Sequence, residues 1–220
     1  MRKRTIIIIS IVSTILSIIW VILTYFGITR YLSLHTSLSS ETYVKNYSKL
    51  PKSDAGRVVI AFTVTPENVN KIRPMINSIL DQTVKVNSIF VVLLSDKKYD
   101  LPKYITDVAT TIPAGKDYGD GTKLIPILLR EKECDTTIIT LDSNVVYGQD
   151  FIYTIIDESL KNPRSVIVDK KGFSMLVKPE LFGCEVINRE KDNFDNNWFL
   201  SKTKNVKVID YYENYRIIGM

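Results

Sequence analysis

The sequence has few of the residues from which metal centres and disulfide frameworks are built. It contains two cysteines and one histidine in 220 residues. Cys134 and Cys184 are too few for a disulfide framework or a four-ligand zinc site, and they fit either one bridge in an oxidising compartment or two buried thiols. His35 lies in a segment that we expect to be a stalk, so a zinc centre and a Ser-His catalytic site are excluded.

The glycine-rich loops that bind phosphate in many nucleotide-binding proteins are absent as well. The segment "GDGTK" at 119–123 places Thr before Lys and has no glycine five residues upstream, so it is not a Walker loop. No Gly-x-Gly-x-x-Gly follows the first predicted strand, which excludes a dinucleotide fingerprint. The net charge of +5 comes from Lys and Arg interleaved with acidic residues. This pattern is typical of a solvated surface, and no nucleic-acid partner is expected.

Charge is missing from one long stretch near the start of the sequence. No charged residue lies between Arg4 and Arg30, where Ile, Val and Leu dominate. As a helix this stretch is long enough to cross a hydrocarbon layer of ~30 Å, whereas a cleaved signal has an apolar region of only ~7–15 residues. A buried core helix is disfavoured by the basic "MRKR" in front of it. We predict a transmembrane signal anchor over residues 5–29, after a basic tail over residues 1–4.

The basic residues that flank the anchor predict its orientation. Three precede it and only Arg30 follows directly, so the positive-inside rule keeps the N-terminus in the cytosol. Residues 30–56, a polar stretch without a sustained apolar period, then form a stalk, and residues 57–220 form a lumenal or exoplasmic domain. The compartment would be ER- or Golgi-like in a eukaryotic cell. Asn46 in "NYS" matches a glycosylation acceptor, which would make the protein a glycoprotein.

Within the domain, short apolar runs alternate with amphipathic stretches. This alternation predicts an α/β fold, Rossmann-like, with a mostly parallel sheet flanked by helices. One helix is expected to begin at Thr65 with Pro66 in its first turn, and to pack on the sheet through Val69, Ile72, Ile76, Ile79 and Leu80. The predicted strands cover 57–64, 88–94, 108–114, 136–141 and 165–169, with further helices within 122–132 and over 149–161.

Polar residues follow three of these strands. Thr63 and Thr65 end the first, Ser95 and Asp96 the second, and Asp142 and Asn144 the fourth. Because ligands of open α/β sheets bind at the carboxyl ends of the strands, this placement predicts a nucleotide-sized site there. Asp142 and Asn144 are two residues apart, so both can point to one side, with Ser143 facing away, if the strand geometry continues into the turn. Their oxygens suit Mg²⁺ or Mn²⁺ on a diphosphate, because phosphate and water supply the other ligands.

Several pieces of the sequence resemble one known family. "KDYGDGTKLIPIL", followed by a strand and "LDSNVVYG", is similar to the nucleotide-sugar-binding half of GT-A-fold glycosyltransferases, in a group that carries Asp-Tyr-Gly-x-x-Thr-Lys and an Asp-x-Asp-type motif. "TVTPENVNKIRPMINSILDQT" resembles that group's first strand and helix. The resemblance covers roughly residues 57–168, with its pieces in the same order. The chain departs from the family by having Ser143 and Asn144 where further acids are usual.

The resemblance implies a role for each matched residue. Asp142 and Asn144 would hold a divalent metal and the donor diphosphate. Asp96 would lie near the base or ribose, while Asp117 and Lys123 would contact the sugar or phosphates. Gly119 and Gly121 would let the backbone turn tightly beside the ligand.

The C-terminal third would hold the acceptor. "GFSMLVKPELFG" and "DNFDNNWFLSK" resemble the family's acceptor-side strand and acidic helix start. Asp195 is the candidate catalytic base, since an inverting transfer needs a carboxylate to take the acceptor's proton, and Asp192 is the second candidate.

Simpler roles exist for most of these residues. Asp142 could form a turn, Asp96 could lie in an ordinary turn, Lys123 could be a solvated lysine, and Asp195 could cap a helix. The predicted function is a membrane-anchored, metal-dependent glycosyltransferase that moves a sugar from a nucleotide-sugar donor to a glycan or protein acceptor. The alternative is a catalytically silent relative that binds a glycan or protein partner.

Overall fold

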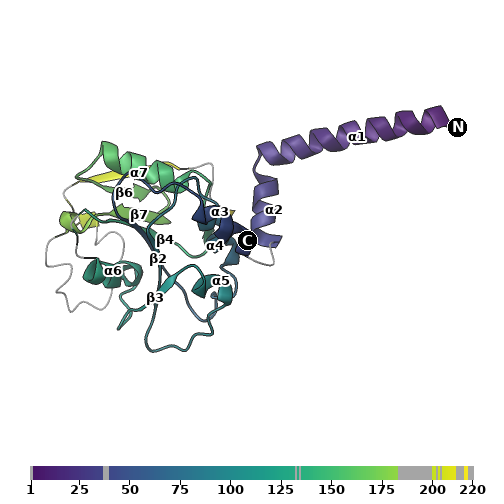
Figure 1. Ribbon diagram of the computed structural model, residues 1–220. Coiled ribbons are helices and arrows are strands. Elements are labelled where there is room, and N and C mark those ends of the chain that lie inside the picture. The colour runs from purple at the N-terminus through teal and green to yellow at the C-terminus, as the bar shows by residue number, and fades with distance from the viewer. Residues whose placement is uncertain are drawn as a thin grey trace. The chain divides into compact units, whose positions relative to one another are not determined.

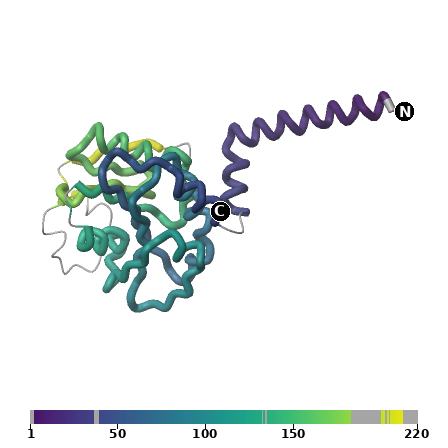
Figure 2. Tube along the Cα trace, viewed as in Figure 1, coloured from purple at the N-terminus to yellow at the C-terminus, as the bar shows by residue number. Residues whose placement is uncertain are grey.

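The structure is a computed structural model that describes residues 2–36, 40–131, 133, 135–182, 200–201, 203, 205–211 and 216–217. The chain forms two compact units, Met1–Leu38 and Ser39–Met220. Figure 1 labels their helices and strands, and the tube in Figure 2 lets the chain be followed from its purple start to its yellow end.

The first unit consists of two helices, α1 (Arg2–Tyr25) and α2 (Ile28–Thr36). Gly27, with a φ of 67°, adopts the left-handed conformation that lets the chain change direction between them. The stretch Lys3–Tyr25 has a hydropathy of 2.9 over its most apolar window, and its side chains are not buried in protein. By length and composition α1 can therefore cross a membrane, although an N-terminal signal sequence meets the same criterion.

The segment that we expected to be a stalk is partly packed into the second unit. Helix α3 (Glu41–Ser48) lies against α4 (Arg73–Leu80), and Tyr47 is only 9% exposed. The Tyr47 hydroxyl accepts a hydrogen bond from the Val86 N–H at 2.9 Å, and Ser40 Oγ donates to Asn77 Oδ1 at 2.7 Å. The apolar positions of α3 are too few to give a sustained period in the sequence, but Tyr43 and Val44 join Tyr47 on one helical face against the core.

A seven-stranded sheet forms the centre of the second unit. The strand order is β3-β2-β1-β4-β7-β6-β8, with parallel pairing from β3 to β4 and between β6 and β8, and with β7 antiparallel to both neighbours. The α/β prediction with a mostly parallel sheet is confirmed. The strand bounds are β1 (Val58–Thr63), β2 (Ser88–Leu93), β3 (Thr110–Pro113), β4 (Thr137–Leu141), β6 (Val166–Asp169), β7 (Ser174–Val177) and β8 (Val206–Ile209).

Helices cover both faces of this sheet. One core cluster joins α4 and α7 (Phe151–Lys161) to one face, together with α3 and α5 (Lys103–Thr106). The other face is covered by the 3₁₀ turn η1 (Asp120–Lys123) and α6 (Ile125–Arg130), and Figure 1 shows α6 across the sheet from α7. The central strands β1 and β4 are buried almost throughout, which explains their uninterrupted apolar sequences.

Two later elements complete the fold. A short 3₁₀ turn η2 (Pro179–Leu181) follows β7. A separate two-stranded sheet joins β5 (Val145–Val146) to β9 (Arg216–Ile217). In Figure 2 the yellow C-terminal segments accordingly lie against the green part of the chain.

The first helix of the domain begins later than predicted. Residues 66–71 form turns, and α4 starts at Arg73 with Pro74 in its first turn. A proline in a helix interior lacks the N–H that its turn requires, and its ring clashes with the carbonyl four residues earlier. Pro74 is therefore tolerated only in the first turn of a helix, and a helix from Thr65 cannot continue through it. Val69 and Ile72, placed on the predicted helical face, are nevertheless buried, because the turns pack them on the sheet.

An ion pair joins the start of β1 to the end of α6, at the edge of the sheet where the parallel strands begin. Arg57 precedes β1, and its guanidinium donates to both oxygens of Glu131, at 2.7 and 2.8 Å. Glu131 follows the last turn of α6 and is buried. The hydrogen bonds from Arg57 lower the pKa of the Glu131 carboxyl, because they favour its charged form.

Candidate functional site

The loops that follow β1, β2 and β3 are tied together at the opposite edge of the sheet. The Tyr99 hydroxyl accepts a hydrogen bond from the Leu94 N–H at 3.3 Å and donates to the Val64 carbonyl at 3.2 Å. The Gly115 N–H donates to Ser95 Oγ at 3.2 Å. These bonds hold the first three strand ends in one rim, as expected for a parallel sheet.

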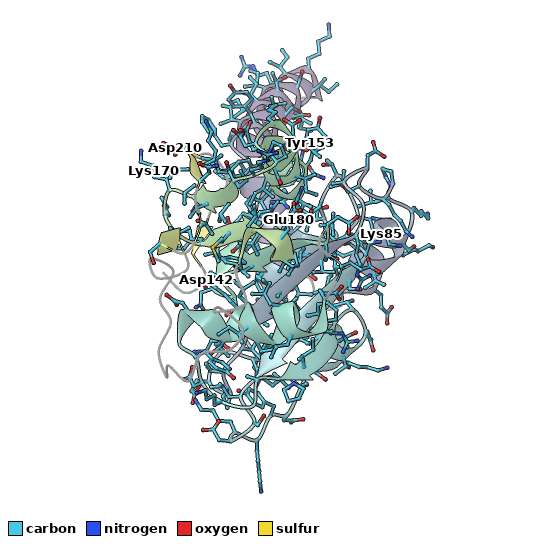
Figure 3. The ribbon with its side chains drawn as sticks, turned by 90° about the vertical axis from the view of Figure 1, so that its left-hand side faces the viewer. Lys85, Asp142, Tyr153, Lys170, Glu180 and Asp210 are labelled. Carbon is cyan, nitrogen blue, oxygen red and sulfur yellow. The ribbon has the colours of Figure 1, made fainter. Side chains whose placement is uncertain are left out.

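The turn that follows β4 belongs to the same rim. Asn68, in the loop after β1, accepts a bond from the Thr65 N–H at 2.8 Å and donates to Ser143 Oγ at 3.2 Å. Ser143 is buried, whereas Asp142 is half-buried and Asn144 exposed. Because β4 ends at Leu141 and Ser143 and Asn144 form a turn, the two-residue alternation of a strand does not extend to these residues. Figure 3 shows Asp142 at one side of the domain and Lys85, which precedes β2, at the other.

Asp142 has a turn-forming role in the structure. Its Oδ1 accepts a hydrogen bond from the Asn144 N–H at 2.8 Å, which closes the turn after β4. This bond fixes the carboxylate with one oxygen engaged. Among the described residues no group binds the second oxygen, which leaves it available to a ligand.

The predicted donor-binding loop is also internally braced. Asp117 Oδ1 accepts hydrogen bonds from the Gly119 N–H at 2.8 Å and from Thr122 Oγ1 at 3.0 Å, and Thr122 Oγ1 accepts one from the Tyr118 N–H at 2.8 Å. Gly119 has φ 62° and ψ −133°, a conformation open essentially to glycine alone. The tight turn expected at Gly119 is therefore present. Gly121, in contrast, does not have a positive φ and is part of η1.

Lys123 lies at the end of η1 with its side chain half-buried. Burial lowers the pKa of its ammonium, while the negative charges of Asp120 and Asp142 act in the opposite direction. Within the described residues no carboxylate comes close enough to form an ion pair with it. The site therefore has one incompletely neutralised cation within electrostatic range of Asp142, an arrangement suited to an anionic ligand.

Of the remaining predicted residues, one lies in a described loop and the others lie outside the described residues. Asp96 is exposed in the turn after β2, next to the Ser95 that holds Gly115, and this placement fits both the ribose role and an ordinary turn. Asp195 and Asp192, the candidate bases, and Cys134 and Cys184 lie outside the described residues. The roles of Asp96, Asp117, Lys123, Asp142 and Asn144 stay predictions.

The residues present fit a divalent cation that shares its coordination with a diphosphate. In the described part of the chain no cluster of three His, Cys, Asp or Glu side chains forms a complete metal cage. A magnesium-type site does not require one, because phosphate oxygens and water complete its octahedron. The unengaged oxygen of Asp142 and the exposed amide of Asn144 are hard ligands of the required kind.

Two buried polar residues that hold this region were missed at the sequence level. Gln82 Nε2 donates to the carbonyls of Ser78 and Gly148, and its Oε1 accepts from the Ile152 N–H, which joins α4 to the start of α7. Tyr147 is fully buried, and its hydroxyl contacts the backbone of Asp142. A sequence pattern shows neither role, since both depend on segments distant along the chain.

Comparisons with known proteins place the fold but give no family. No protein-family model and no curated protein matches the sequence. Among solved structures, S. aureus TarS aligns with a TM-score of 0.51 and 12% identity over 74% of this chain and 36% of TarS. A TarS fragment, 1–349, gives a TM-score of 0.52 and 10% identity over 74% of this chain and 60% of the fragment.

A shorter protein matches over nearly its whole length. The 4-diphosphocytidyl-2C-methyl-D-erythritol synthase of Anaerococcus prevotii gives a TM-score of 0.50 and 11% identity over 76% of this chain and 92% of the synthase. This chain spans about a third of TarS itself. At these identities the matches show the fold alone, a GT-A-like mixed α/β architecture, and one apolar N-terminal helix precedes it in the chain.

Proposed function

We propose that this protein is a nucleotide-sugar-dependent glycosyltransferase that is anchored to a membrane by α1. The observation that carries the proposal is the position of Asp142 and Lys123. They lie within electrostatic range of each other at the strand ends of a GT-A-like sheet, where open α/β folds bind nucleotides. The sequence resemblance predicts donor-binding roles for the same two residues.

Each braced loop would contribute one part of donor binding. The Lys123 ammonium would neutralise a phosphate, since the loss of hydration that disfavours its charge would be offset by an anionic neighbour. Asp117 has one oxygen committed to Gly119 and Thr122, and its other oxygen would accept a hydrogen bond from the donor's sugar. Asp96, on the adjoining turn, would accept from the ribose.

A divalent cation is part of this proposal. Asp142 and Asn144 would hold Mn²⁺ or Mg²⁺ against the diphosphate, and the cation would supply charge neutralisation of the leaving group. Asn144 carries no charge, so the metal would be held chiefly by Asp142 and the phosphates. Asp195, or failing it Asp192, is proposed as the base that takes the proton of the acceptor hydroxyl.

The membrane part of the proposal rests on α1 and its flanks. The helix is long and apolar enough to span, and the basic residues before it favour a cytosolic N-terminus. The catalytic unit would then face a lumen or the exterior and act on glycans or glycoproteins there.

One observation favours a second candidate, a relative that binds without turnover. The only carboxylate in "DSN" has one oxygen occupied by the Asn144 N–H, so the proposed metal position is poor in negative charge. A site with a weakened cation could bind a nucleotide or a glycan and still fail to activate the leaving group.

Donor hydrolysis by the full chain in detergent separates the two candidates. The donors are UDP- and GDP-sugars with Mn²⁺, and the Asp142→Ala variant is the control. Release of nucleoside diphosphate that requires both Mn²⁺ and Asp142 supports the enzyme. Binding of UDP or GDP without release supports the silent relative. Neither binding nor release contradicts the enzyme and restricts the silent relative to a glycan or protein partner.

A further inference from the structure

Tyr147 lies behind the candidate metal position and is fully shielded from solvent. Its side chain is 0% exposed, and its ring packs against Phe151 with centroids 4.8 Å apart. Its own N–H donates to Ser78 Oγ at 3.1 Å, which ties it to α4. The preceding residues, β5, pair with β9. Apart from its hydroxyl, Tyr147 is therefore held by α7 through its ring and by α4 through its backbone N–H.

The Tyr147 hydroxyl forms hydrogen bonds with both the N–H and the carbonyl of Asp142. It accepts a hydrogen bond from the Asp142 N–H at 2.8 Å. Its single proton is directed at the carbonyls of Phe173 and Asp142, at 3.0 and 3.2 Å. The Asp142 N–H is shared with the Phe173 carbonyl, at 2.9 Å. One phenol oxygen thus joins the end of β4 to the residue that precedes β7.

These contacts bear on the direction of the Asp142 carboxylate. The side chain leaves a backbone whose N–H is bonded to Tyr147 and the Phe173 carbonyl, and whose carbonyl accepts from Tyr147 and, at 3.4 Å, from the Val145 N–H. Its Oδ1 is held by the Asn144 N–H. With the backbone and Oδ1 both fixed, Oδ2 has one preferred direction. Positioning of this kind lowers the cost of ordering a ligand-binding group at the moment of binding.

We propose that Tyr147 is the positioning residue of the site, whose hydroxyl fixes the Asp142 carboxylate for its ligand. Tyr147 touches no ligand itself and acts only through the Asp142 backbone. The inference rests on the proposed function to the extent that nucleotide binding at Asp142 is one of its readouts.

Tyr147→Phe is the sharpest test, because it removes the hydroxyl and keeps the ring that packs on Phe151. A purely structural loss must be separated from a loss of positioning. Tyr47→Phe provides the matched control, since Tyr47 is also buried and its hydroxyl also bonds a backbone N–H, that of Val86, near the start of β2. Both variants lose a buried hydroxyl, and only one of these hydroxyls touches Asp142.

Two measurements on the full chain in detergent decide the matter. The first is titration with UDP and with GDP in the presence of Mn²⁺. The second is hydrogen exchange, followed by mass spectrometry, of the peptide that covers 141–147 and so includes the Asn144 amide. We expect Tyr147→Phe to weaken nucleotide binding roughly tenfold or more and to speed exchange in this peptide. Tyr47→Phe should match the wild type in both.

Wild-type affinity in Tyr147→Phe overturns the inference, as does an equal loss of affinity in Tyr47→Phe. A wild-type chain that binds neither nucleotide refutes the proposed function. The exchange measurement then decides the inference alone: faster exchange confined to Tyr147→Phe supports it, and unchanged exchange overturns it.

Discussion

Replacing Gln82 with leucine should destabilise the second unit markedly, because this one side chain satisfies three backbone groups. Its Nε2 donates to the carbonyls of Ser78 at 2.8 Å and Gly148 at 2.6 Å, and its Oε1 accepts from the Ile152 N–H at 2.9 Å. Gln82 itself is 3% exposed, so water does not readily replace these bonds. Leucine has a similar volume and leaves no large cavity, which isolates the polar loss.

The magnitude follows from the groups left without partners. The Ser78 carbonyl and the Ile152 N–H lose the bonds described above, whereas the Gly148 carbonyl keeps one from the Phe151 N–H. At ~1–3 kcal/mol for each unsatisfied buried group, two groups cost about 3–4 kcal/mol. For a unit of this size that loss corresponds to a fall in melting temperature of roughly 6–15 °C.

Urea and thermal unfolding of the full chain in detergent, followed by circular dichroism, measure this loss. Gln149→Leu is the matched control, because Gln149 is exposed and only its backbone carbonyl is used, by the Thr83 N–H. A Gln82→Leu variant that loses less than about 1 kcal/mol, or no more than Gln149→Leu, would refute the reasoning.

Three further predictions concern charge, backbone and membrane. Because the folded-state pKa of Glu131 is lowered, its ion pair with Arg57 should contribute stability above the carboxyl's unfolded pKa, and that contribution should disappear as pH falls through the folded pKa. Glu131→Gln should flatten the acid limb of a stability-versus-pH curve, whereas an unchanged limb counts against the pair. Gly119→Ala should cost about 2 kcal/mol in urea unfolding, since alanine at φ 62° and ψ −133° is strained, and no loss would mean that the turn relaxes freely. The full chain should stay with membranes after alkaline carbonate washing and be released by detergent; a shortened chain in the soluble fraction would instead show that α1 is a cleaved signal.

Removing the charge of Lys123 should affect folding stability and nucleotide affinity in opposite directions. Burial disfavours its charged form in the folded state, so Lys123→Met, which keeps an apolar stem, should leave stability unchanged or raise it. The same variant should weaken UDP binding about tenfold, because a phosphate loses its cation. A loss of stability together with unchanged binding would assign Lys123 to the fold and not to the site.

The sheet could be predicted from the sequence because its strands are buried on both faces. Runs such as those around Ile60 and Ile139 have no polar alternation, and a parallel sheet covered by helices is the architecture that such runs favour. The polar residues after Thr63 and Leu141 then predict a site at the edge where these strands end. The predicted start of this helix was wrong by several residues, because the apolar spacing extends back beyond Pro74 although a proline is tolerated only in the first turn of a helix.

The parts that sequence reasoning missed depend on contacts between distant segments. Helix α3 is too short to show a period, and its place is set by Tyr47 reaching Val86. In the sequence Tyr147 is an ordinary aromatic residue after "DSNVV". Only the fold shows that its hydroxyl accepts a hydrogen bond from the Asp142 N–H. The sequence placed Asp142 directly after a predicted strand, but it could not show that the Asn144 N–H occupies one of its oxygens.

The most direct test of the account is calorimetric titration of the full chain in detergent with UDP and with GDP, with and without Mn²⁺, beside Asp142→Ala. Asp142 is half-buried and its Oδ1 closes only the local turn, so the variant should still fold, and circular dichroism checks this. The account predicts binding of one nucleotide that requires Mn²⁺ and is lost in Asp142→Ala. Binding of neither nucleotide, or binding that survives in Asp142→Ala, would contradict it.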